Sequence, residues 1–238
     1  MTFVILPMII PILKLNIFYS QLFSTSDKNN MKKFPTLPPL VPHRNSSVYT
    51  QNFFKQIFLA QGWEMHGEFP NLAKAVAIIS PHTSNIDAWH GFLALLGLNI
   101  KITIFGKNTL FNTPLKPILK WIGVIPVVRN SAQGQTQQIA DIIAAKDQIW
   151  IGMAPEGTRK EAEKIRSGFY HIAHTAQIPI VMFTFDYQNK IIRILGTFNT
   201  TGDYEKDLEN ILKTYEGNFS PKHEKWLAKP LQKHWKKD

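Results

Sequence analysis

Residues 75–80 have the sequence AVAIIS, and residues 81–87 continue it as PHTSNID. The first stretch is an unbroken run of small and β-branched apolar side chains that ends at a proline, which is typical of a strand buried on both faces. The second stretch fits the start of a helix, because Ser84 and Asp87 have the spacing of a capping box. The sequence therefore predicts a buried strand, a turn and a helix at this point.

Similar short apolar runs recur along the chain, and helical patterns separate most of them. This alternation favours an α/β fold with a mixed, mostly parallel sheet flanked by helices. In such folds the chemistry usually lies in loops just beyond the carboxyl ends of the strands. The other expected strands are 63–68, 101–105, 124–128, 148–153, 178–185 and 191–195, and the expected helices are 48–60, 85–96, 115–121, 136–145 and 168–176.

The composition limits the class of protein. Of the 238 residues, 44% are hydrophobic and 18% are charged, which suffices for one sizeable core, so we expect one catalytic domain at 48–238. The absence of cysteine excludes disulfides, thiolate metal sites and a thiol nucleophile. The net charge of +10 favours anionic partners, among them nucleic acid, anionic lipid surfaces and phosphorylated metabolites.

The N-terminal region has a different composition. Residues 1–23 are strongly apolar but contain Pro7, Pro11 and Lys14, so a membrane anchor or interfacial helix, a loosely docked tail and an untranslated stretch before Met31 all remain open. Residues 24–47 are rich in Ser, Asn, Pro and Lys, which predicts a linker on the surface.

His82 and Asp87 are the first candidates for catalysis. A general base needs a histidine whose other ring nitrogen is held by an acceptor, and Asp87 can supply that acceptor across the turn. The alternative is structural, because Asp87 also suits the capping box with Ser84. Ser84 is an alternative nucleophile, although it has an obvious capping role.

Further polar residues follow other predicted strands. Residues 154–159, APEGTR, offer free backbone donors, a hydroxyl and a guanidinium, which together suit a phosphate, although a solvated turn has the same composition. Lys107 follows the run at 101–105, and Arg129 ends the stretch GVIPVVR at 123–129. These strand ends are expected to converge on one edge of the sheet.

Taken together, these motifs resemble those of the glycerolipid acyltransferases, the family typified by 1-acylglycerol-3-phosphate acyltransferase. Three substitutions depart from the family pattern, because Pro81, Val128 and Ala154 replace an Asn, an Asp and an aromatic residue, which leaves the acceptor head group open. His82 and Asp87 match the His-x4-Asp block, and the Gly-to-Arg, Pro-Glu-Gly-Thr-Arg and apolar-Pro blocks match 123–129, 155–159 and IPIV from Ile178.

The resemblance implies the glycerolipid acyltransferase fold and an O-acyltransferase activity. His82 would be the general base on the acceptor hydroxyl and Asp87 would orient it, without an acyl-enzyme, a metal or a cofactor. The acyl group would come from the thioester of acyl-CoA or acyl carrier protein, and the expected acceptor is a lysophospholipid such as 1-acylglycerol-3-phosphate. The residues expected to position its phosphate are Lys107, Arg129, Glu156, Gly157, Thr158 and Arg159.

Several alternatives remain at this level. The acceptor could be another lipid, such as a lyso-ornithine lipid, or the chain could be a non-catalytic membrane lipid-binding protein. The basic, Trp-containing C-terminus suits a membrane surface, a solvated tail or, less well, nucleic acid. We expect association with the cytoplasmic face of a membrane and no nucleic acid partner, and we expect His90, His171 and His174 to be packing or surface residues.

Overall fold

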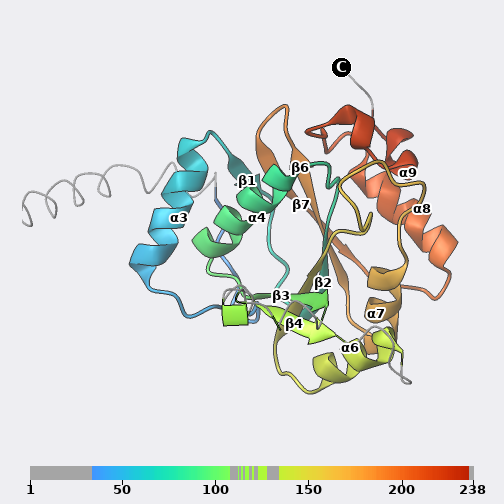
Figure 1. The fold of residues 1–238 in the computed structure, drawn as a ribbon, viewed down its shortest axis with the longest axis horizontal. Helices are drawn as coiled ribbons and strands as arrows, with labels where there is room; N and C mark the ends of the chain where they lie inside the picture. The colour runs from blue at the N-terminus through green and yellow to red at the C-terminus, as the bar shows by residue number, and fades with distance from the viewer. Residues whose placement is uncertain are drawn as a thin grey trace, which may run out of the picture. The chain divides into compact units, whose positions relative to one another are not determined.

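A single sheet organises the computed structural model, which describes residues 34–107, 112, 114, 116–117, 120, 123–127 and 134–235. Among these residues seven strands pair in the order β1-β7-β6-β2-β5-β3-β4 (Figure 1). All neighbouring pairs are parallel except β6 and β7. The strands are β1 (Glu64–His66), β2 (Lys74–Ile79), β3 (Ile102–Lys107), β4 (Val124–Val127), β5 (Ile149–Met153), β6 (Ile180–Asp186) and β7 (Ile191–Phe198).

Helices lie on both sides of the sheet (Figure 1). On one side α3 packs against α4, and on the other α6 packs against α7 while α8 contacts β7. The predicted fold class, a mixed and mostly parallel sheet flanked by helices, is therefore confirmed. The helices are α3 (Val48–Ala60), α4 (Asn85–Gly97), α6 (Gln135–Ala144), α7 (Gly168–Ala176), α8 (Tyr204–Tyr215) and α9 (Lys229–Gln232), with a 3-10 turn η2 at Glu224–Trp226.

β2 lies in the middle of the sheet between β5 and β6, as its apolar sequence predicts. Its side chains Val76 and Ile78 are buried in a core cluster with Ile151, Ile180 and Phe169 from β5, β6 and α7. Burying one such aliphatic side chain contributes about 1.5–3 kcal/mol. The carboxyl ends of β2, β5 and β6 are thereby held firmly next to one another.

Part of the stretch predicted as a linker packs against the rest of the domain. Val41 is fully buried, the Lys101 amide donates to the Pro42 carbonyl at 2.8 Å, and His43 forms an isolated bridge with Ile100. The chain before residue 47 thus already pairs with the segment that leads into β3. Composition did not reveal this pairing, since it depends on a strand-like partner about 60 positions later.

The N-terminal segment predicted as an anchor, a tail or an untranslated stretch, residues 1–23, lies outside the described residues. In the part of the chain that the structure does describe, no helix combines the length and apolar character that a bilayer-crossing segment requires. The helix predicted at 115–121 also lies mostly outside the described residues.

Candidate active site

The two strongest motifs meet at the carboxyl edge of the sheet. β2 and β5 are parallel neighbours in which Ile78 pairs with Met153, so the turns after them emerge side by side. Glu156 Oε1 accepts hydrogen bonds from the backbone amide of His82 at 3.2 Å and from Ser80 Oγ at 2.5 Å. The Pro-Glu-Gly-Thr-Arg turn is therefore attached directly to the turn that carries His82.

His82 and Asp87 form a dyad in which His82 Nδ1 lies 3.0 Å from Asp87 Oδ2. The same carboxylate oxygen accepts the backbone amides of Thr83 and Ser84, each at 2.8 Å. The Asp87 side chain is 1% exposed and that of His82 is 20% exposed. The acid is thus enclosed and held in place while the imidazole reaches the surface of the site.

The capping interpretation of this turn is correct as well, because both hydrogen bonds of the capping box at the start of α4 are present. Ser84 Oγ accepts the Ile86 amide at 3.1 Å, which is its structural role. Asp87 therefore caps α4 and orients His82 with the same carboxylate. With a carboxylate at Nδ1, the ring proton lies there and Nε2 can accept a proton.

Tyr187 is a site residue that no sequence motif indicated. It follows β6, and its hydroxyl donates to Asp87 Oδ1, the oxygen that His82 does not contact. Burial, and then the hydrogen bond to Asp87, raise the pKa of Tyr187. In the sequence, its position directly after the apolar run of β6, a strand that neighbours β2, is the feature that could have indicated it.

Glu156 does not have the surroundings expected for a phosphate-contacting residue. Its side chain is 3% exposed, and burial raises its pKa although the hydrogen bond from Ser80 lowers it. Oε2 has no hydrogen-bond partner among the described residues. A buried carboxyl group that bonds the His82 amide suits the support of the turn that carries His82 rather than contact with an anion.

The rest of this turn is more open. Gly157 has φ +65°, and a Cβ at that position would collide with the Arg166 side chain that crosses it. Thr158 Oγ1 accepts the Lys160 amide at 3.2 Å, and Arg159 is exposed. Gly157 and Arg166 line a pocket of about 370 Å³ whose other walls come mainly from β5, α6 and α7.

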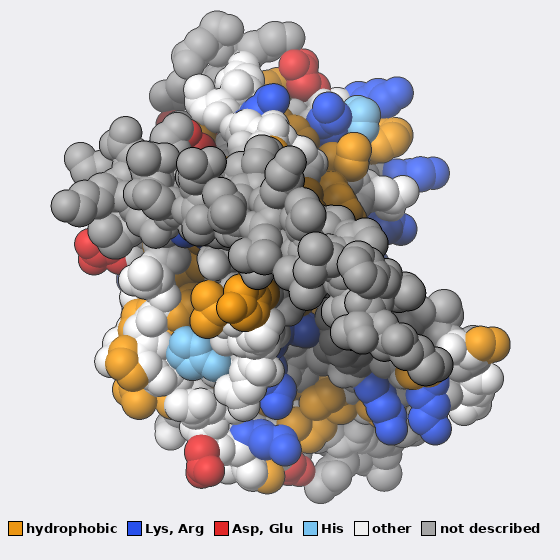
Figure 2. Space-filling view, turned by 90° about the vertical axis from the view of Figure 1, so that its left-hand side faces the viewer, with side chains coloured by type: hydrophobic (Ala, Val, Ile, Leu, Met, Phe, Trp, Pro, Cys, Tyr) orange, Lys and Arg blue, Asp and Glu red, His pale blue; other side chains and the backbone are white. Residues whose placement is uncertain are grey.

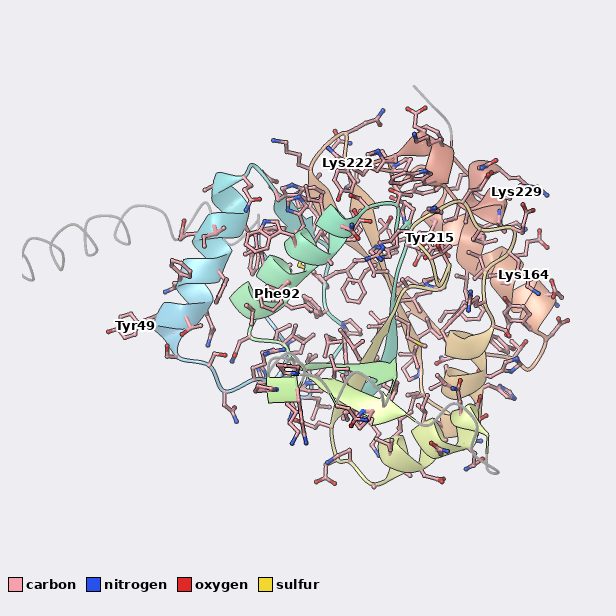
Figure 3. The ribbon with its side chains drawn as sticks, viewed as in Figure 1. Tyr49, Phe92, Lys164, Tyr215, Lys222 and Lys229 are labelled. Atoms are coloured by element: carbon pink, nitrogen blue, oxygen red, sulfur yellow. The ribbon has the colours of Figure 1, made fainter. Side chains whose placement is uncertain are left out.

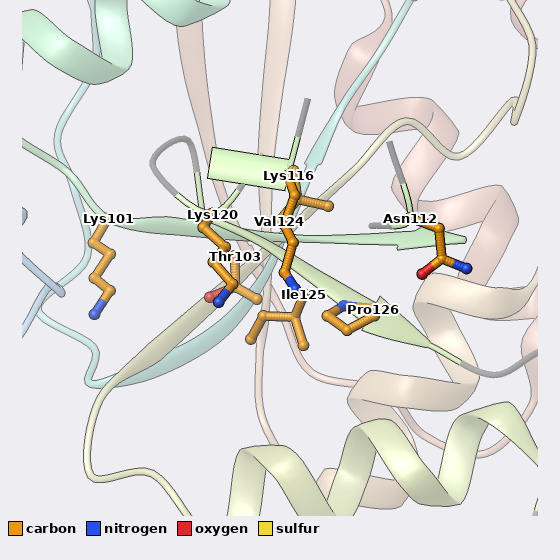
Figure 4. Close-up of a pocket in the computed structure, with 9 residues that line it drawn as sticks. Lys101, Thr103, Asn112, Lys116, Lys120, Val124, Ile125 and Pro126 are labelled. Atoms are coloured by element: carbon orange, nitrogen blue, oxygen red, sulfur yellow. The ribbon is translucent and has the colours of Figure 1, made fainter. Parts of the chain in front are cut away.

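The two remaining cations predicted for the site are described only in part. Lys107 is the last residue of β3 and pairs with Val127 of β4, which fixes its backbone at the predicted edge. Arg129 lies outside the described residues. A second pocket, of about 530 Å³, lies along β3 and β4 and includes Lys101, Lys116 and Lys120 (Figure 4).

The C-terminal part of the chain also reaches the dyad. Thr83 Oγ1 accepts the backbone amides of Lys222 at 3.1 Å and His223 at 3.3 Å. Lys222 Nζ lies 5.5 Å from the ring centroid of Tyr187. Figure 3 shows Lys222 at the end of the sheet where α4 begins. This segment is anchored by Ser220, whose hydroxyl donates to Asp186 at 2.8 Å.

The other histidines have packing partners. His90 stacks on Trp63 with ring centroids 4.3 Å apart, and His174 Nδ1 lies 3.0 Å from Thr200 Oγ1. His171 stacks on Tyr204. Among the described residues no three His, Cys, Asp or Glu side chains gather as a metal site would require.

Comparison with known proteins found one matching family and a similar solved structure. A family model described as acyltransferase matches residues 63–186, just over half of the chain and the part from Trp63 to the end of β6. Among solved structures, the 1-acyl-sn-glycerophosphate acyltransferase PlsC from Thermotoga maritima is similar with a TM-score of 0.49 and 13% identity, covering 84% of this chain and 85% of that one. No curated protein matches the chain.

Proposed function

This chain belongs to the acyltransferase family, and we propose that it transfers a fatty acyl group from an acyl thioester to the free hydroxyl of a lysophospholipid. The observation that carries the proposal is the dyad, in which the 3.0 Å contact between His82 Nδ1 and Asp87 Oδ2 leaves the second ring nitrogen available. General-base catalysis of this kind typically contributes about 10²–10⁴ in rate.

In the proposed reaction His82 Nε2 removes the proton of the acceptor hydroxyl as its oxygen attacks the thioester carbonyl. The new C–O bond forms, the C–S bond breaks, and the proton passes from the imidazolium to the departing sulfur. Asp87 stabilises the imidazolium and keeps the ring in place. The donor is acyl-CoA or an acyl carrier protein thioester, and no metal or cofactor takes part in these steps.

We propose that the acceptor is 1-acylglycerol-3-phosphate or a close relative whose phosphate binds beside the Pro-Glu-Gly-Thr-Arg turn. The bond between Glu156 and the His82 amide supports this placement, because the residues after Glu156 then start next to the dyad. Within that turn the roles differ, since Glu156 supports the His82 turn. The phosphate-binding residues are then Gly157, Thr158 and Arg159, together with Lys107 and Arg129.

We also propose that the protein works at the cytoplasmic face of a membrane, because the acceptor is a lipid. Large apolar side chains are exposed on the adjacent helices α3 and α4, among them Tyr49 at 86%, Phe53 at 59% and Trp89 at 47%. Figure 3 shows Tyr49 pointing away from the rest of the molecule. Figure 2 shows Lys and Arg side chains near exposed hydrophobic ones, a combination that suits an anionic bilayer surface.

The C-terminal residues support this membrane role only in part. Trp235 packs against the core, so its ring is partly buried, while Lys236 and Lys237 lie outside the described residues. Trp226 is likewise half-buried, and Lys225 Nζ lies 5.4 Å from its ring centroid. The helices α3 and α4 are therefore the better supported membrane-facing surface.

The test is an acyl-transfer assay with purified full-length protein, one acyl-CoA or acyl carrier protein, and a panel of acceptors. We expect labelled product with 1-acylglycerol-3-phosphate, and a loss of about 10²–10⁴ in kcat for His82→Ala. His174→Ala is the matched control, because it removes a hydrogen-bonded histidine elsewhere. Product formed only with lyso-ornithine lipid or another acceptor would overturn the proposed acceptor. Full activity of His82→Ala would contradict the proposed mechanism.

A further inference from the structure

Tyr187 contacts Asp87 through the carboxylate oxygen that His82 does not contact. Asp87 Oδ2 is occupied by His82 and two backbone amides, whereas the Tyr187 hydroxyl donates to Oδ1. We infer that Tyr187 is a positioning residue for the reaction, acting on His82 through Asp87. The inference rests on the proposed function, and Tyr187 lies just outside the segment 63–186 that matches the family.

The geometry explains why a second contact matters. Rotation about the Cβ–Cγ bond of Asp87 would turn Oδ2 away from Nδ1, and the contacts at Oδ2 restrain this rotation from one oxygen only. A donor on Oδ1 fixes the plane of the carboxylate and therefore the direction of the imidazole. Displacements of about 1 Å at a catalytic group can cost about 100-fold in rate, so this restraint has a measurable effect.

Tyr187 is suited to act only as a donor. Burial of the ring, together with the negative charge of Asp87, raises the pKa of its hydroxyl, so the proton stays on the oxygen at neutral pH. The hydroxyl therefore donates to Asp87 and does not compete with His82 as a base. A phenylalanine in its place would keep the ring but leave the buried Oδ1 without this bond.

Tyr187 is itself held from several directions. Its ring packs edge-on against Trp63 at a centroid distance of 5.0 Å, and Lys222 Nζ lies 5.5 Å from the same centroid. Its backbone amide donates to the Ser220 carbonyl at 3.2 Å. β6 continues past the last residue that pairs with β2, Phe183 opposite Ile79, and so carries Tyr187 over the catalytic turn.

The test compares Tyr187→Phe with Tyr170→Phe in the full chain. Tyr170 donates to Asp207, another buried carboxylate, at 2.8 Å, so both variants lose one tyrosine-to-aspartate hydrogen bond. We expect kcat to fall about 10–100-fold in Tyr187→Phe while KM for either substrate changes less than about threefold. Tyr170→Phe should lower the thermal unfolding midpoint without a comparable loss in kcat.

A double-mutant cycle decides whether Tyr187 acts through Asp87. In an Asp87→Ala background, Tyr187→Phe should cause no further loss of kcat, because the group it orients is already absent. If wild type is active, an unchanged kcat for Tyr187→Phe would overturn the inference but not the proposed function. Additive losses of kcat in the cycle would do the same. A wild type inactive on every acceptor would instead overturn the proposed function, and the inference with it.

Discussion

The carboxylate of Glu156 accepts the backbone amide of His82 at 3.2 Å, although the two residues lie 74 positions apart in sequence. The contact joins the two motifs that were most prominent in the sequence and follows from the parallel pairing of β2 with β5. It assigns Glu156 to the support of the turn that presents His82. Substitutions at Glu156 should therefore affect both folding and catalysis.

Replacing Glu156 with glutamine should make stability less dependent on pH. Burial raises the pKa of Glu156 above its ordinary value of 4.5, so the stability that depends on the protonated group is complete below 4.5 and is lost as pH rises through the folded-state pKa. Glutamine cannot ionise and can still accept from Ser80 and His82. Denaturant unfolding at several pH values should show that the free energy of unfolding of Glu156→Gln rises relative to that of wild type as pH increases. The same difference between the two proteins at every pH would contradict this.

Glu156→Ala should be more damaging than Glu156→Gln. It leaves the buried Ser80 hydroxyl and the His82 amide without their acceptor, at a cost of about 1–3 kcal/mol in the free energy of unfolding. The loss should also lower kcat, because the His82 turn is less well held. Unfolding and kinetic measurements on both variants check this, and equal behaviour of the two would rule out the proposed support.

Asp87→Asn should lower kcat by about 10²–10⁴, because an amide cannot hold His82 in the tautomer that a base requires or stabilise the imidazolium. Asp207→Asn is a matched control, since Asp207 is also 1% exposed and accepts hydrogen bonds from Tyr170 and Thr201. Steady-state kinetics should show the large loss for Asp87→Asn only. Similar losses in the two variants would mean that the effect is structural.

Gly157→Ala should destabilise the protein for two separable reasons. Its backbone is left-handed, which costs about 1–2 kcal/mol for a residue with a Cβ, and the new methyl group would meet Arg166. Adding Arg166→Ala should recover the steric part alone. Gly217→Ala shares a positive φ, 71°, but has open space around it and reports the backbone part. Equal unfolding energies for Gly157→Ala with and without Arg166→Ala would show that the collision is absent.

Thr83→Val should loosen the C-terminal segment from the catalytic turn. The valine has a similar shape but offers no acceptor to the amides of Lys222 and His223, which costs about 1–3 kcal/mol. Thr83→Ser keeps the hydroxyl and should stay close to wild type in both stability and kcat. Faster hydrogen exchange at residues 222 and 223 in the valine variant alone would confirm the cause, and unchanged exchange there would contradict it.

Much of the fold could be predicted because local patterns decide it. The unbroken apolar run at 75–80 is β2, and the capping spacing of Ser84 and Asp87 marks the start of α4. α8 was not predicted, although Leu208, Ile211, Leu212 and Tyr215 have helical spacing. Most of its other residues are charged or polar, so its apolar face is narrow. The pairing of residues 42–44 with 99–101 was missed because no local pattern encodes it.

The site was predictable only where its residues belong to contiguous motifs. His82 and Asp87 lie on one turn, and their contact follows from it. Tyr187 reaches Asp87 from 100 positions away, so its role depends on how far β6 extends beside β2. Glu156 was expected among the phosphate ligands because the family resemblance implied it, and the parallel pairing of β2 with β5 brings its carboxylate to the His82 amide.

The link from Thr83 to Lys222 spans 139 positions of the chain. At a synthesis speed of roughly 5–20 residues per second, a ribosome needs about 7–28 s to travel between the two. During that time a growing polypeptide contains His82 and Asp87 but not the segment that fastens their turn. We therefore expect the protein to acquire its activity only after the segment that contains Lys222 has been synthesised.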